Sequence, residues 1–251
     1  MPEPDAGAAA GRGARSADRD PSLPARAQLA ALAASSSSGE AFAHLRPPIG
    51  AEGRAAAVLM LFGELDRVPS ERPAEASVVS RDLDVLLVER ASSLRAHPGQ
   101  IAFPGGRIDP GDGGPVDAAL REAHEETGLD VTGVEVLGPL GVVPLERSQH
   151  LVTPVLGWWA SPSPVRVVDE AECAAVFRTP VAELLDPGNR GVTVIRRDRQ
   201  EWRGPAFLIQ TDAGERTLWG FTAMLLDALF DGLGWTEAWD ERRELPLSTL
   251  G

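Results

Sequence analysis

Apolar residues fall mainly in short runs separated by polar segments, which is the pattern of a sheet-rich domain. Four runs are long enough for strands, at 55–62, 84–90, 134–143 and 151–159. Shorter extended pieces are predicted at 100–103, 192–195 and 206–209. The polar stretch 64–80 holds two prolines and is expected to be a loop.

The chain has fewer helical patterns than strand patterns. Residues 116–127 are predicted to form a helix, because Pro115 stands at its start and Gly128 follows its end. We expect one or two short helical pieces over 170–185 and a long helix over 217–233. Because strands outnumber helices without alternating regularly with them, the pattern predicts an α+β fold with a mixed sheet rather than a doubly wound one.

The first part of the chain carries little periodicity. Residues 1–23 are mostly Ala, Gly, Pro, Asp and Arg and are expected to be disordered. A short helix is predicted over 25–34, followed by a flexible break at 35–39. We therefore expect an N-terminal extension over residues 1–44 and a folded domain over residues 45–251.

Net charge, cysteine content and the length of the apolar runs argue against some kinds of function and location for this chain. The formal net charge of −13 makes broad nucleic-acid binding a poor expectation, while hydrophobic residues at 43% are enough for a packed core. With Cys173 as the single cysteine, a disulfide within the chain is excluded, and a buried thiol in a helical segment is expected there.

No apolar run approaches the roughly 20 residues that span a membrane, and no signal peptide is seen, so the expected location is the cytoplasm.

The segment 120–129 carries the candidate chemistry. In a helix, Glu122, Glu125 and Glu126 point roughly the same way, and three like charges on one face cost free energy unless something neutralises them. Hard divalent cations that prefer oxygen ligands, such as Mg²⁺ or Mn²⁺, do this well. A solvated acidic face is the alternative, but the preceding Arg121 and glycine-rich turn favour a metal site.

Residues 106–129 resemble the Nudix box, which ends in Arg-Glu-aliphatic-x-Glu-Glu-x-Gly-aliphatic. The match over 121–129 is complete if Ala123 is accepted as a small aliphatic residue. The first half departs from the family pattern, because Asp112 stands where Glu is usual and the gap to Arg121 is one residue longer.

This resemblance implies a Nudix α/β/α sandwich and a site that binds Mg²⁺ or Mn²⁺. Glu122, Glu125 and Glu126 would bind the metal, and which of them orients or deprotonates the attacking water stays open. Arg121 would hold a glutamate of the box through a salt bridge. Glu172 resembles a position that reaches the active site from outside the box as a metal ligand or base; a surface glutamate is the alternative.

Residues 86–106 are similar to an extra motif of the coenzyme A pyrophosphatase branch of the Nudix family, with Val88 where Thr is usual. The planar guanidinium of arginine can donate two hydrogen bonds to phosphate oxygens. The alternatives to phosphate binding are that Arg90 faces solvent and that Arg95 pairs with a carboxylate. The resemblance and this chemistry imply substrate contacts by Arg90, Arg95, His97, Gly105 and Gly106.

The sequence therefore predicts hydrolysis of coenzyme A, or its derivatives, to 4′-phosphopantetheine (or its acyl form) and adenosine 3′,5′-bisphosphate. One alternative is a Nudix hydrolase of another nucleoside diphosphate compound, such as ADP-ribose or a dinucleotide. A second, of a different class, is a Nudix-fold module that binds a ligand without catalysis. A nucleic-acid or membrane partner is not expected, and whether the chain forms a homodimer is open.

Overall fold

A computed structural model describes most of the chain, including every segment predicted above to form a strand. The described residues are 23–36, 42, 45, 51–64, 70–74, 77–94, 97–145, 149–197 and 200–247. The tail expected over residues 1–23 lies almost wholly outside these ranges. The domain boundary expected near Leu45 stays a prediction.

The centre of the fold is a mixed sheet of eight strands in the described residues. Strand β1 (Arg54–Glu64) pairs in parallel with β7 (His150–Trp159) and antiparallel with β2 (Leu83–Arg90). The other strands of this sheet are β3 (Ile101–Ala102), β4 (Gly105–Arg107), β5 (Val134–Pro139), β6 (Val143–Leu145) and β8 (Cys173–Pro180).

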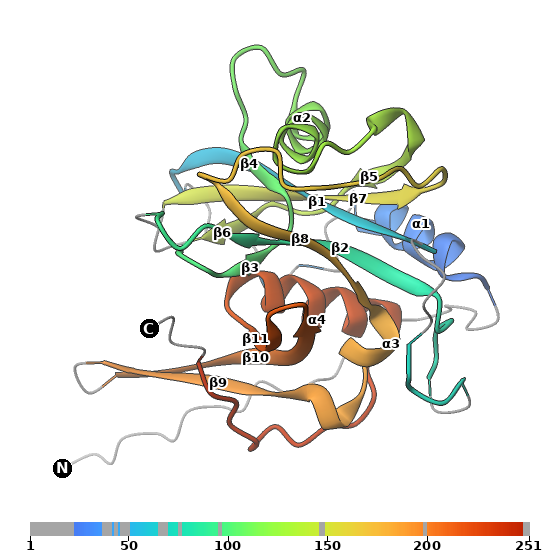
Figure 1. The fold of residues 1–251 in the computed structure, drawn as a ribbon, viewed down its shortest axis with the longest axis vertical. Coiled ribbons are helices and arrows are strands. Elements are labelled where there is room, and N and C mark those ends of the chain that lie inside the picture. The colour runs from blue at the N-terminus through green and yellow to red at the C-terminus, as the bar shows by residue number, and fades with distance from the viewer. Residues whose placement is uncertain are drawn as a thin grey trace.

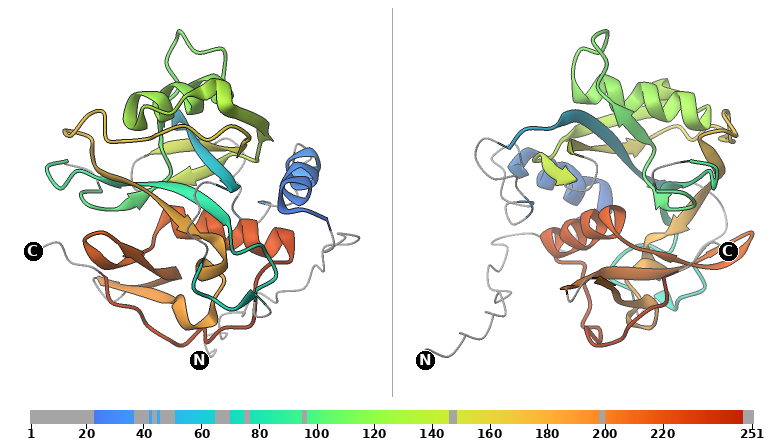
Figure 2. Two further views of the ribbon diagram at one scale, coloured as in Figure 1. Left: turned by 45° about the vertical axis from the view of Figure 1, so that its right-hand side comes forward. Right: turned by 90° about the vertical axis from the view of Figure 1, so that its left-hand side faces the viewer.

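Helices cover both faces of this sheet (Figure 1). Helix α2 (Pro115–Thr127) lies on one face, and α4 (Phe221–Leu233) lies on the other with α1 (Ala25–Ser36) beside it (Figure 2). Because side chains alternate along a strand, Leu59 and Leu61 pack toward α2 while Met60 and Phe62 pack toward α4. The α+β sandwich with a mixed sheet that the sequence predicts is confirmed.

A smaller antiparallel sheet lies beyond α4 and adds a further layer (Figure 1). Its strands are β9 (Arg190–Arg197), β10 (Gln200–Thr211) and β11 (Gly214–Leu218). The first two are longer than the pieces predicted at 192–195 and 206–209, and β11 occupies the start of the helix predicted over 217–233. That helix instead begins at Phe221, after Gly220 with its φ of 70°.

The prediction of helical pieces over 170–185 is wrong for most of its length. Residues 173–180 form β8, which pairs antiparallel with β2 from Asp84↔Pro180 to Arg90↔Cys173, and helix α3 is confined to Val181–Leu184. The Glu-Cys-Ala-Ala start suits a helix locally, but the ladder to β2 overrides that local preference. The predicted strand 134–143 is likewise split, because β5 ends at Pro139 and β6 begins at Val143.

The predicted N-terminal helix is confirmed as α1, and it packs onto the body of the fold. Leu29 and Leu32 are fully buried in the same core cluster as α4. The buried Gln28 side chain accepts a hydrogen bond from the indole N–H of Trp235 at 2.8 Å. None of the helices in the described ranges is long and apolar enough to cross a membrane.

Candidate active site

Helix α2 carries the acidic residues, and its ends are set by local chemistry. Pro115 occupies the first turn, where its missing N–H costs nothing. Gly128 ends the helix in the left-handed conformation, with a φ of 67°, and its N–H donates to the His124 carbonyl at 2.8 Å. The helix is fixed to the sheet by three fully buried small residues, Ala118, Ala119 and Ala123.

The three glutamates of α2 differ in exposure. Glu126 is 4% exposed, the Glu122 side chain is 16% exposed, and the Glu125 side chain is 56% exposed. The expectation that all three point the same way is therefore met best by Glu122 and Glu126, which are one helical turn apart. Glu125 lies at the solvent edge of this acidic face.

Strand β4 runs beside the buried end of the acidic face. The Gly105 N–H donates to a carboxylate oxygen of Glu126 at 3.0 Å. A Cβ on Gly106 would lie 2.5 Å from the Glu122 carboxylate, and one on Gly105 would lie 2.3 Å from the Ala57 carbonyl oxygen. Both glycines are thus needed for the close approach of β4 to the acidic helix on one side and to β1 on the other.

Burial gives the two inner glutamates unusual proton affinities. Loss of hydration raises the pKa of Glu126 to about 7, although the Gly105 hydrogen bond and the Arg90 charge oppose this shift. Burial also raises the pKa of Glu122, against the effect of Arg121. The negative charge of Glu172 raises the pKa of both, so the three carboxylates influence one another electrostatically.

Arg121 organises the outer part of the site. Its guanidinium makes a two-point ion pair with Asp112, at 2.9 and 3.0 Å, and reaches the Arg107 carbonyl at 3.0 Å. Another nitrogen contacts Glu122 and Glu125, each at 3.0 Å. The Arg121 contacts hold the pKa of the Asp112 carboxyl below its usual range. Asp112 was missing from the predicted site residues; its place in the first half of the box was the signal for it.

The end of β2 brings Arg90 to the acidic helix. Glu89 pairs with Ala175 and Arg90 with Cys173, so the register shifts there and Ala174 is the extra residue on β8. The positive charge of Arg90 lowers the pKa of Glu126. The Arg90 Nε is buried and finds no hydrogen-bond partner in the described part of the chain. The residue as a whole is half-buried.

Two residues at the start of β8 complete this side of the site. Glu172 is exposed, and its carbonyl accepts a hydrogen bond from the Ala91 N–H at 2.8 Å, which ties it to the end of β2. The buried thiol expected at Cys173 is found, in a strand rather than a helix, and is 1% exposed. Burial and the Glu126 charge raise the pKa of this thiol to about 12, which makes it a poor nucleophile.

The remaining predicted substrate residues lie on the segment between β2 and β3. His97 is half-buried, and its Nδ1 is 2.9 Å from the side-chain oxygen of Gln100. Arg95 lies outside the described residues.

The donor set suits a hard divalent cation in its chemistry, but not in its present arrangement. Across the ranges that the structure describes, no three His, Cys, Asp or Glu side chains stand in metal-binding geometry. Glu122 and Glu125 contact Arg121, and Glu126 accepts the Gly105 N–H. Carboxylate oxygens are nevertheless the ligands that such ions prefer. Burial is the main cause of the raised pKa of Glu122 and Glu126, and the neighbouring carboxylates add to it.

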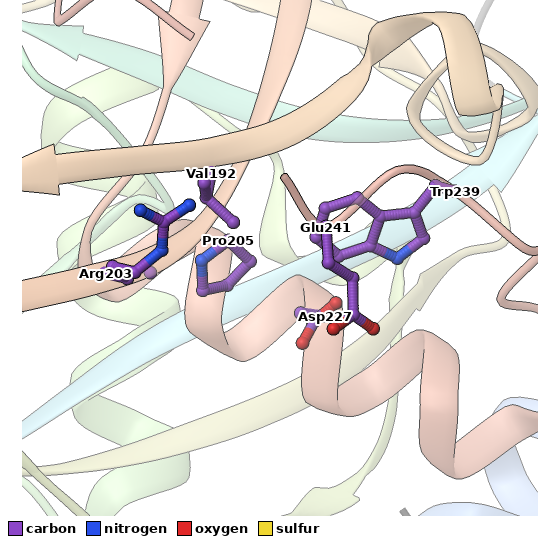
Figure 3. Close-up of a pocket in the computed structure, with 7 residues that line it drawn as sticks. Val192, Arg203, Pro205, Asp227, Trp239 and Glu241 are labelled. Carbon is purple, nitrogen blue, oxygen red and sulfur yellow. The ribbon is translucent and has the colours of Figure 1, made fainter. Parts of the chain in front are cut away.

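A cavity of about 260 Å³ lies elsewhere, between α4, the small sheet and the segment after α4 (Figure 3). Beside it, the buried Arg190 guanidinium lies 4.9 Å from the ring centre of Phe207 and 4.6 Å from that of Trp239. The cavity contains none of the predicted site residues. It is lined by Val192, Arg203, Gly204, Pro205, Asp227, Trp239 and Glu241.

Comparison with known proteins gives a family match over the region that holds the site. The model of the NUDIX domain family matches residues 71–197. The chain is 38% identical over 146 residues to an "Uncharacterized Nudix hydrolase NudL" of Escherichia coli K12, covering 58% of this chain and 72% of the relative. It is 37% identical over 133 residues to "Nudix hydrolase 3" of Caenorhabditis elegans, covering 52% of this chain. The chain spans about half the length of that nematode relative, 54%.

Solved structures show more distant likeness. A MutT/nudix family protein from Enterococcus faecalis has a TM-score of 0.43 and 18% identity, over 76% of this chain and 65% of that one. The NUDIX domain of Shewanella oneidensis NrtR, solved with ADP ribose, has a TM-score of 0.38 and 21% identity, over 57% of this chain and 84% of that one.

Proposed function

The chain belongs to the Nudix hydrolase family, and from this premise we propose that it cleaves the pyrophosphate bond of coenzyme A or its acyl derivatives. The products are 4′-phosphopantetheine, or its acyl form, and adenosine 3′,5′-bisphosphate. The observation that carries the choice of substrate is Arg90. It ends β2 within the stretch 86–106 that is similar to the coenzyme A motif, and its buried Nε has no partner among the described residues.

A divalent cation, Mg²⁺ or Mn²⁺, would be held by carboxylates of the acidic helix. Glu122 and Glu126 are the inner ligands, Glu125 joins them from the solvent edge, and Glu172 approaches from the start of β8. Glu122 and Glu125 contact Arg121 in this structure, so both carboxylates would exchange that contact for the ion if they held it. When bound, the metal neutralises pyrophosphate charge and lowers the pKa of a coordinated water.

The chain's own residues hold this arrangement in place. The Gly105 N–H orients the Glu126 carboxylate, and Arg121 sets the starting positions of Glu122 and Glu125. The Arg90 guanidinium offers donors to phosphate oxygens of the substrate and offsets part of the negative charge beside Glu126. Arg95 and His97 would contact the parts of the substrate outside the pyrophosphate.

The experiment uses the full chain with coenzyme A and Mg²⁺ or Mn²⁺, beside ADP-ribose, a dinucleotide and nucleoside triphosphates. We expect adenosine 3′,5′-bisphosphate to form fastest from coenzyme A and to disappear with a chelator. Glu126→Gln should lower turnover by about 100-fold or more while the protein stays folded. Glu52→Gln, a change at an exposed glutamate outside the site, is the matched control and should leave the rate unchanged.

Other outcomes decide between the alternatives. Cleavage of ADP-ribose or a dinucleotide without cleavage of coenzyme A rejects the proposed substrate and keeps the metal site. Nucleotide binding that survives Glu126→Gln, with no turnover by either protein, indicates a binding module instead of an enzyme.

A further inference from the structure

A short turn over residues 97–100 is attached directly to Arg90. The Gly99 N–H donates to the Arg90 carbonyl at 3.0 Å, and the Arg90 N–H donates to the Gln100 carbonyl at 3.0 Å. Arg90 is close enough to the acidic helix for its charge to lower the pKa of Glu126. The turn therefore borders the candidate active site through the backbone of Arg90.

His97 has a backbone conformation that few side chains adopt. Its φ is 56°, in the left-handed region where a Cβ costs free energy and where Gly or Asn are the usual residues. Strained residues of this kind cluster at functional sites, where the surrounding structure holds them. A histidine at this position suggests that the imidazole itself is needed.

The imidazole of His97 contacts the Gln100 side chain through one of its two nitrogens. Its Nδ1 is 2.9 Å from the Gln100 side-chain oxygen, and the Gln100 N–H also donates to the His97 carbonyl at 3.3 Å. Because an amide oxygen only accepts, this contact corresponds to the tautomer with the hydrogen on Nδ1, in which Nε2 is an acceptor. No group in the described ranges forms a hydrogen bond with Nε2, and the residue is only half-buried.

We propose that Gln100 is a positioning residue, which sets the tautomer and orientation of His97 so that Nε2 accepts a hydrogen bond from the substrate. The donor is a hydroxyl or amide N–H in the part of the substrate outside the pyrophosphate, because phosphate oxygens offer no hydrogen to an acceptor. This inference rests on the proposed function, since it names a contact made by the same substrate in the same site.

The test compares four variants with the wild type on coenzyme A, with kcat and KM measured separately. Gln100→Leu removes the acceptor for Nδ1, and KM should rise about fivefold to tenfold with kcat within twofold. Gln100→Glu keeps an acceptor oxygen at this position and should restore most of the wild-type KM. His97→Gly and His97→Asn suit the left-handed backbone, so both should stay folded while KM rises as in Gln100→Leu.

A double variant distinguishes a Gln100 that positions His97 from a Gln100 that contacts the substrate independently of His97. If Gln100 acts through the imidazole, Gln100→Leu combined with His97→Asn should raise KM no further than His97→Asn alone. Additive effects, or a wild-type KM in His97→Asn, overturn the proposal. So does a fall in thermal stability with unchanged KM in Gln100→Leu, because that is the signature of a purely structural turn.

The wild-type assay separates this proposal from the proposed function. If the wild type cleaves another nucleotide but not coenzyme A, the proposed substrate fails, and the same variants are measured on the nucleotide that is cleaved. If the wild type cleaves none of the nucleotides, both proposals are rejected.

Discussion

Arg121 and Asp112 form a two-point ion pair that closes the loop between β4 and α2, with nitrogen–oxygen distances of 2.9 and 3.0 Å. The side chain of Asp112 is one methylene shorter than that of the glutamate usual in the family, and the loop that carries it is one residue longer. The extra residue offers a reason why the shorter carboxylate still reaches the guanidinium. Arg121 can then hold the loop, Glu122 and Glu125 at the same time.

Replacement of Arg121 by lysine should therefore damage the site without unfolding it. An ammonium group cannot make the two parallel hydrogen bonds to Asp112 and still reach both glutamates. We expect kcat/KM to fall about 10- to 100-fold, with weaker binding of Mn²⁺ measured by calorimetry. Arg216→Lys serves as a control, because Arg216 lies on β11, outside the site. Wild-type kinetics in Arg121→Lys would contradict the organising role of this arginine.

Glu126 should make the stability of the metal-free protein depend on pH. Its pKa is raised to about 7 in the folded state, so the folded chain holds a proton that the unfolded chain releases near its ordinary value of 4.5. The contribution of Glu126 to stability should therefore be greatest below the unfolded pKa, fall as pH rises toward 7, and then level off. The expected loss is on the order of 2–3 kcal/mol.

Urea denaturation in a chelator at several pH values between 4 and 8.5 measures this dependence. In Glu126→Gln the fall should be much smaller, because the amide does not ionise. Glu52→Gln is the control for the removal of one carboxylate from the surface. An equal pH slope in Glu126→Gln and the wild type would show that another group is responsible.

Gly106 should tolerate no side chain. A Cβ there would lie 2.5 Å from the Glu122 carboxylate, so Gly106→Ala must push this glutamate away from its position or shift β4. We expect at least a tenfold loss of kcat/KM. Gly111→Ala is the matched control in the loop that follows, because nothing lies within 4 Å of a Cβ at that position. Similar activities in the two variants would contradict the close approach of β4 to Glu122.

Cys173 should be inert in the folded protein. It is 1% exposed and its thiol has a pKa of about 12, so few thiolates form at neutral pH and reagents do not reach them. A maleimide should label the native protein much more slowly than the urea-unfolded one, with mass spectrometry as the measurement. Because the chain has one cysteine, every labelled molecule reports on this position. Rapid native labelling would mean that the start of β8 opens readily.

The elements that the sequence predicts well have signals within their own residues. Helix α2 has Pro115 before its acidic run and Gly128 after it, and β1 is a continuous apolar run buried by helices on both faces. Strands β8 and β11 lack such signals. Their residues become strands because β2 and β10 supply the partners, and a pairing partner distant in the chain cannot be read from a local window.

The site shows the same division. The spacing of one helix places Glu122 and Glu126 on a common face beside Arg121, because that information lies within a few residues; their roles in metal binding and catalysis stay predictions. The exposure of the Glu125 side chain and the ion pair between Asp112 and Arg121 depend on how the loop before α2 lies against the helix. The position of Arg90 near Glu126 depends on the pairing of β2 within the sheet, which no local residue pattern specifies.

The contact between Gln28 and Trp235 joins residues separated by 207 positions. On the ribosome, α1 emerges well before α4 and Trp235, which it contacts in the folded chain. Leu29 and Leu32 therefore lack the α4 side of their packing until α4 has been synthesised. The final packing of α1 is therefore a long-range event, because it requires an element nearly two hundred residues further along the chain.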